Sequence, residues 1–110
     1  MAFNPYRRTK YGAKKTESEL CGRTFDSKSE ARRGEELYLL EQAGVIEDLE
    51  YQESFTLCQK PNIKIKVDFA YTVEGEKVYE DAKGMMTREF RVKMAWLEQS
   101  QGIHIDIVKS

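Results

Sequence analysis

The sequence predicts a single α/β domain in which a mixed central β-sheet is flanked by helices. The chain has 110 residues, which is enough for one modest core. Residues 63–73 alternate apolar and polar side chains, as a strand with one buried face does. Two other segments follow helix-capping residues and carry apolar side chains at helical spacing. The resulting order of helix, strands, hairpin, helix and strand is typical of a sheet packed against helices.

Positive charge is concentrated at the N-terminus. Residues 1–15 carry five basic side chains and no acidic one, although the whole chain has a net charge of −1. The basic residues are Arg7, Arg8, Lys10, Lys14 and Lys15. The remaining 95 residues therefore sum to −6, which predicts a basic arm, residues 1–18, on an acidic domain, residues 19–110. The arm either binds DNA phosphates or is a solvated terminus, and charge alone does not separate the two.

Composition disfavours several classes of protein. No run approaches the roughly 20 apolar residues that cross a membrane. The basic N-terminus lacks the apolar stretch of a secretory signal. Cys21 and Cys58 lack CxxC spacing, and His104 is the only histidine that could join them in a zinc site. We therefore expect a cytoplasmic protein with free thiols and no membrane partner.

The first half of the domain is expected to hold one helix. A short strand over residues 19–25 turns at Gly22. Ser27 and Glu30 then have the spacing of a capping box, in which each side chain satisfies a free backbone N–H of the first helical turn. The helix runs to about residue 43 and ends at Gly44, a residue type common just after a helix.

Strands dominate the middle of the chain. Residues 46–50 and 54–59 are two short strand candidates, and a turn at residues 61–62 follows them. The alternating segment 63–73 and a return strand over 77–83 form a hairpin around residues 74–76.

A second helix and a final strand complete the domain. Thr87 can cap a helix that runs to about residue 99, and Gly102 breaks it. The apolar face of that helix consists of Phe90, Met94 and Leu97. The last strand has three alternating apolar positions, Ile103, Ile105 and Ile107.

The hairpin places three charged residues on one face. If its loop is residues 74–75, Asp68 lies opposite Asp81, and if the loop is residues 75–76, Asp68 lies opposite Lys83. Asp81 and Lys83 are two residues apart, so they share a face. In either register Asp68, Asp81 and Lys83 point the same way, with cross-strand neighbours about 5 Å apart.

This cluster suits the chemistry of phosphodiester hydrolysis. Two adjacent carboxylates raise each other's pKa unless a cation lies between them. Carboxylate oxygens suit Mg²⁺ or Mn²⁺, which keep several waters and bind phosphate oxygens. An ammonium group beside such a metal can activate a water or neutralise charge on a reacting phosphate. The alternative is that Asp68, Asp81 and Lys83 form a solvated cross-strand cluster of ion pairs.

The cluster also resembles a known signature. Asp68, followed after twelve residues by Asp81-Ala82-Lys83, resembles the D…(D/E)xK pattern of the PD-(D/E)xK nuclease superfamily. Glu30, on the preceding helix, is similar to the helical acid that many members add. Four segments together look like a small phage-associated family in that superfamily, whose closest functional relatives are Holliday-junction resolvases. These segments are Tyr11–Lys15, Phe25–Lys28, Asp68–Tyr71 and Glu80–Gly84.

The resemblance implies a restriction-endonuclease-like fold and a metal-dependent endodeoxyribonuclease. The roles it implies are binding of Mg²⁺ or Mn²⁺ by Asp68, Asp81 and the Ala82 carbonyl, an outer metal or water contact by Glu30, and catalysis by Lys83. Val67 precedes Asp68 where the superfamily name has a proline, which is a departure from the pattern. Glu80 points away from the cluster by strand alternation, so we leave it out of the site.

The expected substrate is branched DNA, cut by a homodimer with one site for each of two symmetric strands. Arg88 and Arg91 share a helix face and are expected to hold a DNA phosphate near the metal. Two alternatives remain: a nicking or restriction-like endonuclease on the same fold, and a non-enzymatic DNA-binding module that uses the arm. Glu30 also has a purely structural interpretation as a helix cap. Gln52 follows the strand at residues 46–50 and could approach the site, although a surface position is preferred, and Trp96 is interpreted as part of the core.

Overall fold

The computed structural model of the protein describes residues 15–83 and 85–109. Lys15 is exposed, and the predicted DNA contacts Arg7, Arg8, Lys10 and Lys14 lie outside the described residues. In chain order the elements are β1 (Thr16–Ser18), β2 (Arg23–Phe25), α2 (Lys28–Gln42), β3 (Glu47–Cys58), β4 (Ile63–Val73), β5 (Glu76–Lys83), α3 (Arg88–Gln101) and β6 (Ile105–Lys109).

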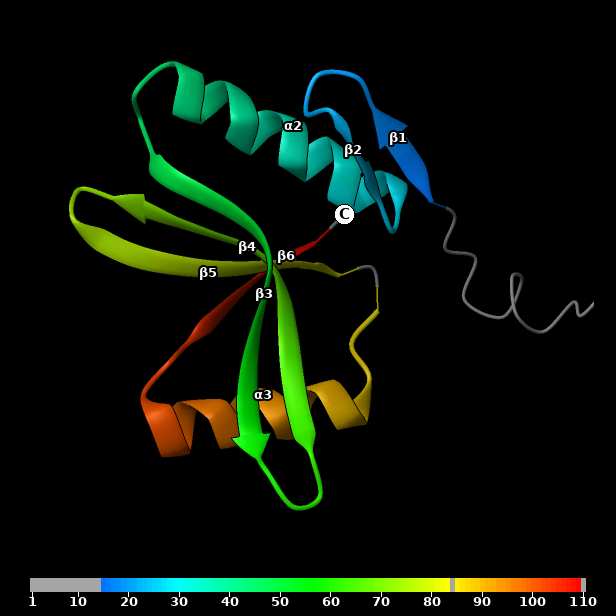
Figure 1. The fold of residues 1–110 in the computed structure, drawn as a ribbon, viewed down its shortest axis with the longest axis vertical. Helices are drawn as coiled ribbons and strands as arrows, with labels where there is room; N and C mark the ends of the chain where they lie inside the picture. The colour runs from blue at the N-terminus through cyan, green and yellow to red at the C-terminus, as the bar shows by residue number, and fades with distance from the viewer. Residues whose placement is uncertain (1–14, 84, 110) are drawn as a thin grey trace, which may run out of the picture.

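The central sheet has the strand order β3-β4-β5-β6. Strands β3, β4 and β5 are antiparallel, whereas β5 and β6 are parallel, so the sheet is mixed. α3 forms the crossover that a parallel pair requires. Figure 1 shows α2 across one end of the sheet and α3 across the other, with the strands crossing between them. The predicted α/β architecture, a mixed sheet flanked by helices, is confirmed. Within the described ranges no helix has the length and apolar character needed to cross a membrane.

The N-terminal boundary of the domain lies earlier than the sequence predicted. Thr16–Ser18, placed in the arm, pairs with β2 as a separate two-stranded sheet. Ser18 is only 2% exposed, and its Oγ donates to Glu35 Oε2 of α2 at 2.6 Å. The single strand expected over residues 19–25 is instead this hairpin, and the predicted turn at Gly22 is present with φ of 69°. The short polar segment looked like an arm because the bond that anchors Ser18 is made to Glu35, 17 residues further along the chain, and no local pattern reveals it.

β3 also differs from expectation. Two short strands were predicted, but residues 47–58 form one strand with register shifts near its start and near its end. Asp48 and Gln52 have φ of 54° and 61°, in the left-handed region that non-glycine residues rarely adopt. These irregular positions interrupt the alternation of side chains, so the sequence reads as two strands where the backbone continues as one.

Both main helices begin and end where their capping residues predict. Ser27 Oγ accepts the Glu30 N–H at 3.1 Å, and Thr87 Oγ1 accepts the Phe90 N–H at 3.1 Å. α2 ends just before Gly44 and α3 ends at Gly102, both of which have positive φ.

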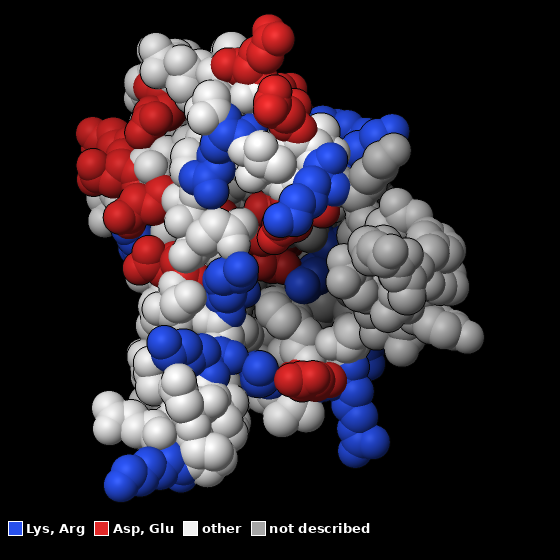
Figure 2. All heavy atoms as spheres, turned by 45° about the vertical axis from the view of Figure 1, so that its right-hand side comes forward, with Lys and Arg blue, Asp and Glu red and all other residues white. Residues whose placement is uncertain are grey.

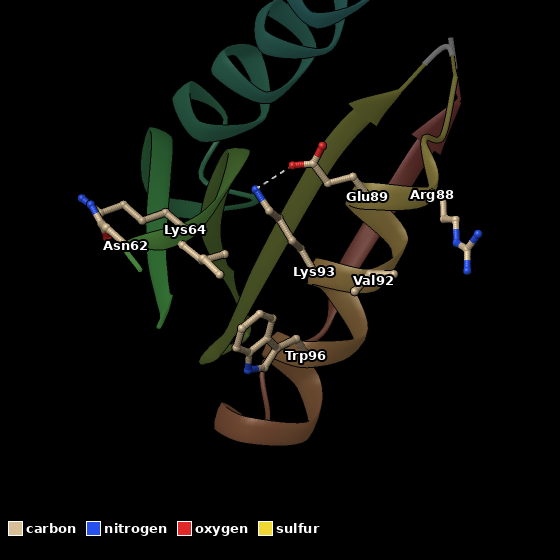
Figure 3. A pocket seen from close by; sticks show the side chains of 8 residues that line it. Asn62, Lys64, Arg88, Glu89, Val92, Lys93 and Trp96 are labelled. Atoms are coloured by element: carbon tan, nitrogen blue, oxygen red, sulfur yellow. Dashed lines mark ion pairs between the residues drawn. The ribbon is translucent and has the colours of Figure 1, made fainter. Parts of the chain in front are cut away.

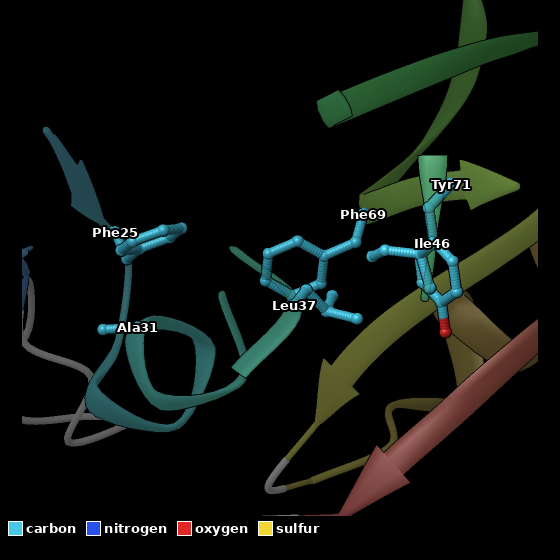
Figure 4. Close-up of a cluster of buried hydrophobic side chains, with 6 residues drawn as sticks. All are labelled: Phe25, Ala31, Leu37, Ile46, Phe69 and Tyr71. Carbon is cyan, nitrogen blue, oxygen red and sulfur yellow. The ribbon is translucent and has the colours of Figure 1, made fainter. Parts of the chain in front are cut away.

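Each helix covers its own hydrophobic cluster. Leu37 of α2 packs with Phe69 and other buried residues, which Figure 4 shows between α2 and the strands. This cluster comprises Phe25, Ala31, Leu37, Ile46, Phe69 and Tyr71. Leu97 of α3 packs with Ile65, Val67 and Ile105 and with the half-buried Phe90 and Met94. Trp96, expected in this core, is instead half-exposed beside an open groove.

The odd-numbered residues of β4 serve both clusters. Ile65 and Val67 pack under α3, whereas Phe69 and Tyr71 pack under α2. Every second residue of a strand normally faces the same side of the sheet. Because these odd-numbered residues pack under two different helices, β4 must twist between Val67 and Phe69. Asp68 lies at this twist.

Candidate active site

The site lies where β4 and β5 separate. Their ladder runs from the Val73–Glu76 pair to the Phe69–Glu80 pair. Glu74 and Gly75 form the loop with φ of 50° and 83°, which is typical of a two-residue type I′ turn. The first of the two predicted registers is therefore the correct one, and continuing it by one residue brings Asp68 opposite Asp81.

The two aspartates close the end of the ladder. The Asp68 N–H donates to Asp81 Oδ1 at 3.0 Å, and the Ala82 N–H donates to Asp68 Oδ2 at 3.0 Å. Each carboxylate thus accepts a backbone N–H of the opposite strand at the point where the regular pairing stops. These reciprocal bonds hold the two carboxyl groups side by side.

Burial leaves their negative charge poorly compensated. Asp81 is 1% exposed, whereas Asp68 is half-buried and the Lys83 side chain is 31% exposed, so the cluster is only partly solvated. Burial, the nearby Asp81 and then Glu30 raise the pKa of Asp68 to about 8, although the Ala82 N–H and Lys83 oppose the rise. Burial also raises the pKa of Asp81, against the opposing charge of Lys83. An ion-pair cluster that stabilised the fold would lower these pKa values, so the pair is suited to an additional cation.

Lys83 lies beside the pair on the same strand face, as predicted. Its Nζ is 3.2 Å from Asp81 Oδ2 and 4.2 Å from the centre of the Phe90 ring. Asp81 Oδ2 is fully buried, and the Lys83 ammonium lies close to it as an ion pair. One ammonium group therefore faces two carboxylates, and the phenyl ring restricts where that ammonium can lie.

The donor set fits a divalent metal that keeps most of its waters. Asp68 and Asp81 supply carboxylate oxygens, and Asp81 Oδ2 lacks a hydrogen-bond donor. The N–H and C=O of one residue lie on the same edge of a β-strand, so the Ala82 carbonyl is also directed toward β4. Within residues 15–83 and 85–109, no three His, Cys, Asp or Glu side chains converge tightly enough to hold an ion by themselves. Two carboxylates completed by waters are a ligand set that Mg²⁺ prefers and Zn²⁺ does not.

Glu30 approaches this pair from α2. It is 4% exposed, and its Oε2 accepts a hydrogen bond from Gln52 Nε2 at 2.8 Å. Burial, followed by the charge of Asp26, raises the pKa of Glu30, and the charge of Asp81 raises it further. Because Glu30 and the aspartates affect one another's pKa values, Glu30 belongs to the same electrostatic site.

Gln52 lies at the site, although the sequence favoured a surface position for it. It is half-buried and bonded to Glu30, so the less favoured interpretation, that it approaches the site, is the correct one. In the β3–β4 register Tyr51 pairs with Phe69 and Glu53 with Val67, so Gln52 lies level with Asp68. Its φ of 61° marks a strained position next to the site. No local sequence signal reveals it, because the pairing joins segments that only the sheet brings together.

Arg23 of β2 also lies near the site, and no sequence pattern predicted it. Its guanidinium stacks on the Tyr51 ring at 4.2 Å, and its Nε is buried without a hydrogen-bond partner. Its positive charge lowers the pKa of Glu30, so it lies within electrostatic reach of the site.

The remaining predicted residues lie around the site. Glu80 faces away from the pair, as expected, and bonds to Arg33 and Tyr71 on the α2 side. Arg88 and Arg91 are exposed on α3. Figure 2 shows acidic side chains gathered toward the α2 end of one face and lysines and arginines over its middle and lower part.

Glu30→Gln separates a structural from a functional role of Glu30. The glutamine keeps the volume, and the Ser27 cap uses only the backbone N–H of residue 30. We expect a melting temperature within a few degrees of wild type, because the lost charge is one that burial already disfavours. If Glu30 acts on the metal or its water, DNA cleavage is lost. Glu36→Gln, on the exposed face of the same helix, is the matched control. Normal cleavage by Glu30→Gln would show that the residue is only structural.

Comparisons with known proteins identify a family but no characterised relative. Residues 8–107 match the family described as "Protein of unknown function (DUF1064)". No curated protein and no solved structure matches the chain. The match includes part of the predicted basic arm and the whole of the candidate site. This chain therefore belongs to the DUF1064 family.

Proposed function

We propose that this protein is a metal-dependent DNA endonuclease with a restriction-endonuclease-like core. The observation that carries the proposal is the pair Asp68, half-buried, and Asp81, buried, which lie side by side with raised pKa values and with Lys83 on the same face. This arrangement supports the resemblance to PD-(D/E)xK nucleases. A module that only bound DNA would have no need for two adjacent carboxylates that share one lysine, so the observation disfavours the non-enzymatic alternative.

Each side chain has a distinct task in this proposal. Asp68, Asp81 and the Ala82 carbonyl hold Mg²⁺ or Mn²⁺, and Glu30, oriented by Gln52, binds a water of its outer shell. The bound ion supplies Lewis acidity toward a phosphate oxygen and lowers the pKa of a water. Lys83, fixed between Asp81 and Phe90, orients the attacking water or neutralises negative charge that develops on the phosphate.

Branched DNA is the proposed substrate. The residues proposed to contact its phosphates are Arg7, Arg8, Lys10, Lys14, Lys15, Arg88 and Arg91. A homodimer would present two such sites to the two symmetric strands of a four-way junction. A nicking or restriction-like endonuclease would use the same catalytic residues, so the preference for substrate decides between them.

The test is cleavage of end-labelled junction, flap and linear DNA by the full chain. We expect cleavage with Mg²⁺ or Mn²⁺, none in EDTA, and binding with little cleavage in Ca²⁺. At sub-saturating Mg²⁺ the rate should rise as the pH increases from 6 to 8, because a proton held by Asp68 with a pKa of about 8 competes with the ion. More Mg²⁺ should shift this rise to lower pH.

Three results would count against the proposal or refine it. Full activity in EDTA contradicts metal dependence. A pH profile that does not change with the Mg²⁺ concentration contradicts the proposed competition between the ion and a proton at Asp68. Equal cleavage of linear and branched DNA supports the nicking or restriction-like alternative.

A further inference from the structure

A second concave region lies between α3 and the start of β4. It has a volume of about 650 Å³ and opens to solvent. Figure 3 shows the Trp96 indole and the Lys93 side chain on the α3 side of this groove, with Lys64 across from them on β4. Val92 adds exposed apolar surface at 55% exposure.

The charge of the groove is positive on a chain whose net charge is negative. Lys64, Arg88 and Lys93 line it, and the one acid among its lining residues, Glu89, is paired with Lys93 at 3.3 Å. An apolar floor with an aromatic ring and a basic rim is what unpaired DNA requires, since bases stack on aromatic rings while phosphates contact lysine and arginine.

The groove continues from the catalytic carboxylates. Lys64 and Lys66 are exposed and alternate with Ile65 and Val67, which pack under α3, so the two lysines lie on the outer side of β4 and Lys64 borders the groove. At the rise of a β-strand, Lys64 lies roughly 13 Å from Asp68 along the chain. On the other wall Lys83 contacts Phe90, in the first turn of the helix that carries Trp96. A strand bound in the groove is therefore directed toward the aspartate pair.

We propose that this groove binds an unpaired DNA strand, with a base stacked on Trp96 and phosphates on Lys64 and Lys93. The inference rests on the proposed nuclease function. Among branched DNAs it favours flaps and other DNA with unpaired nucleotides next to the cut over a fully paired four-way junction. A fully paired duplex keeps its bases stacked on one another and offers none to Trp96.

Trp96 is the only tryptophan of the chain, so its fluorescence reports directly on the groove. We would titrate the full chain in EDTA with oligothymidylate, with a flap duplex and with a fully paired duplex. Saturable quenching is expected for the first two and little change for the third. Because the titration contains no metal, it tests binding separately from cleavage. Quenching in EDTA without cleavage after Mg²⁺ is added would refute only the proposed nuclease activity. Cleavage in Mg²⁺ without quenching in EDTA would refute only the proposal that the groove binds unpaired DNA.

Substitutions test the two contacts. The affinity for labelled oligothymidylate is measured by fluorescence anisotropy. Trp96→Ala should weaken this affinity roughly 5- to 100-fold, and Trp96→Phe should retain most of it. Melting curves of both variants check folding. Lys64→Gln should lower the slope of log affinity against log salt by about one phosphate contact, whereas Lys77→Gln, at the far hairpin tip, should not.

Several outcomes would overturn the inference. One is oligonucleotide binding that leaves Trp96 emission unchanged. Another is a loss in Trp96→Ala that is as large for paired duplex as for oligothymidylate. Emission that depends on protein concentration without DNA would show that a second copy of the chain covers the groove instead.

Discussion

Asp68→Asn is expected to abolish DNA cleavage while making the folded protein more stable at neutral pH. The asparagine keeps an oxygen that can accept the Ala82 N–H but cannot supply the charge that a divalent ion needs. The pKa of Asp68 rises in the folded state from an ordinary value of 3.8 to about 8. The folded state therefore binds more protons than the unfolded state in this window, so its stability falls as the pH rises from about 4 to about 8. Asparagine removes that loss.

The measurements are cleavage in Mg²⁺ and thermal melting in EDTA at pH 5 and pH 8. Cleavage should fall by at least about 10³-fold. The melting temperature at pH 8 should rise by about 4 °C for each kcal/mol relieved, with a smaller change at pH 5. Asp106→Asn, an exposed acid on β6, changes the net charge equally and is the matched control. An active variant that is less stable at pH 8 would mean that the aspartate pair serves the fold alone.

Arg33→Met is expected to cause the largest loss of stability among single substitutions near the site. Arg33 of α2 contacts both carboxylate oxygens of Glu80 on β5, through Nε and, at 3.0 Å, Nη2. Tyr71 Oη donates to the same carboxylate at 2.6 Å. Glu80 is 2% exposed, so removing the arginine leaves a buried charge without its cationic partner. Breaking such pairs costs about 3–5 kcal/mol, and the partial exposure of Arg33 favours the lower end.

A combined variant and a control variant test the explanation given for Arg33→Met. Replacing the whole network, by Arg33→Met with Glu80→Leu and Tyr71→Phe, should recover much of the lost stability, because no buried polar group then remains unpaired. Arg32→Met, the exposed neighbour on α2, should leave urea unfolding nearly unchanged. A single variant as stable as wild type would show that water replaces the arginine. The network matters to the site because it ties α2, which carries Glu30, to β5, which carries Asp81 and Lys83.

The local elements could be predicted because their causes are local. Ser27, Thr87 and Gly102 determine helix ends through hydrogen bonds within one turn. The two-residue loop at Glu74 and Gly75 sets the hairpin register, and with it the pairing that brings Asp68 beside Asp81. β3 was divided in error because Asp48 and Gln52 break the alternation on which strand prediction depends.

The sequence by itself determined the α/β class, the shared face of Asp68, Asp81 and Lys83, and the helix that presents Glu30. Only the tertiary structure decided that Asp81 is buried and Asp68 half-buried, that Gln52 and Arg23 lie near them, and that Trp96 lines a groove instead of filling the core. The physical reason is the distance along the chain over which each effect acts. Capping, alternation and turn geometry act over a few residues, whereas burial, and the pKa values that follow from it, depend on which distant segments pack together.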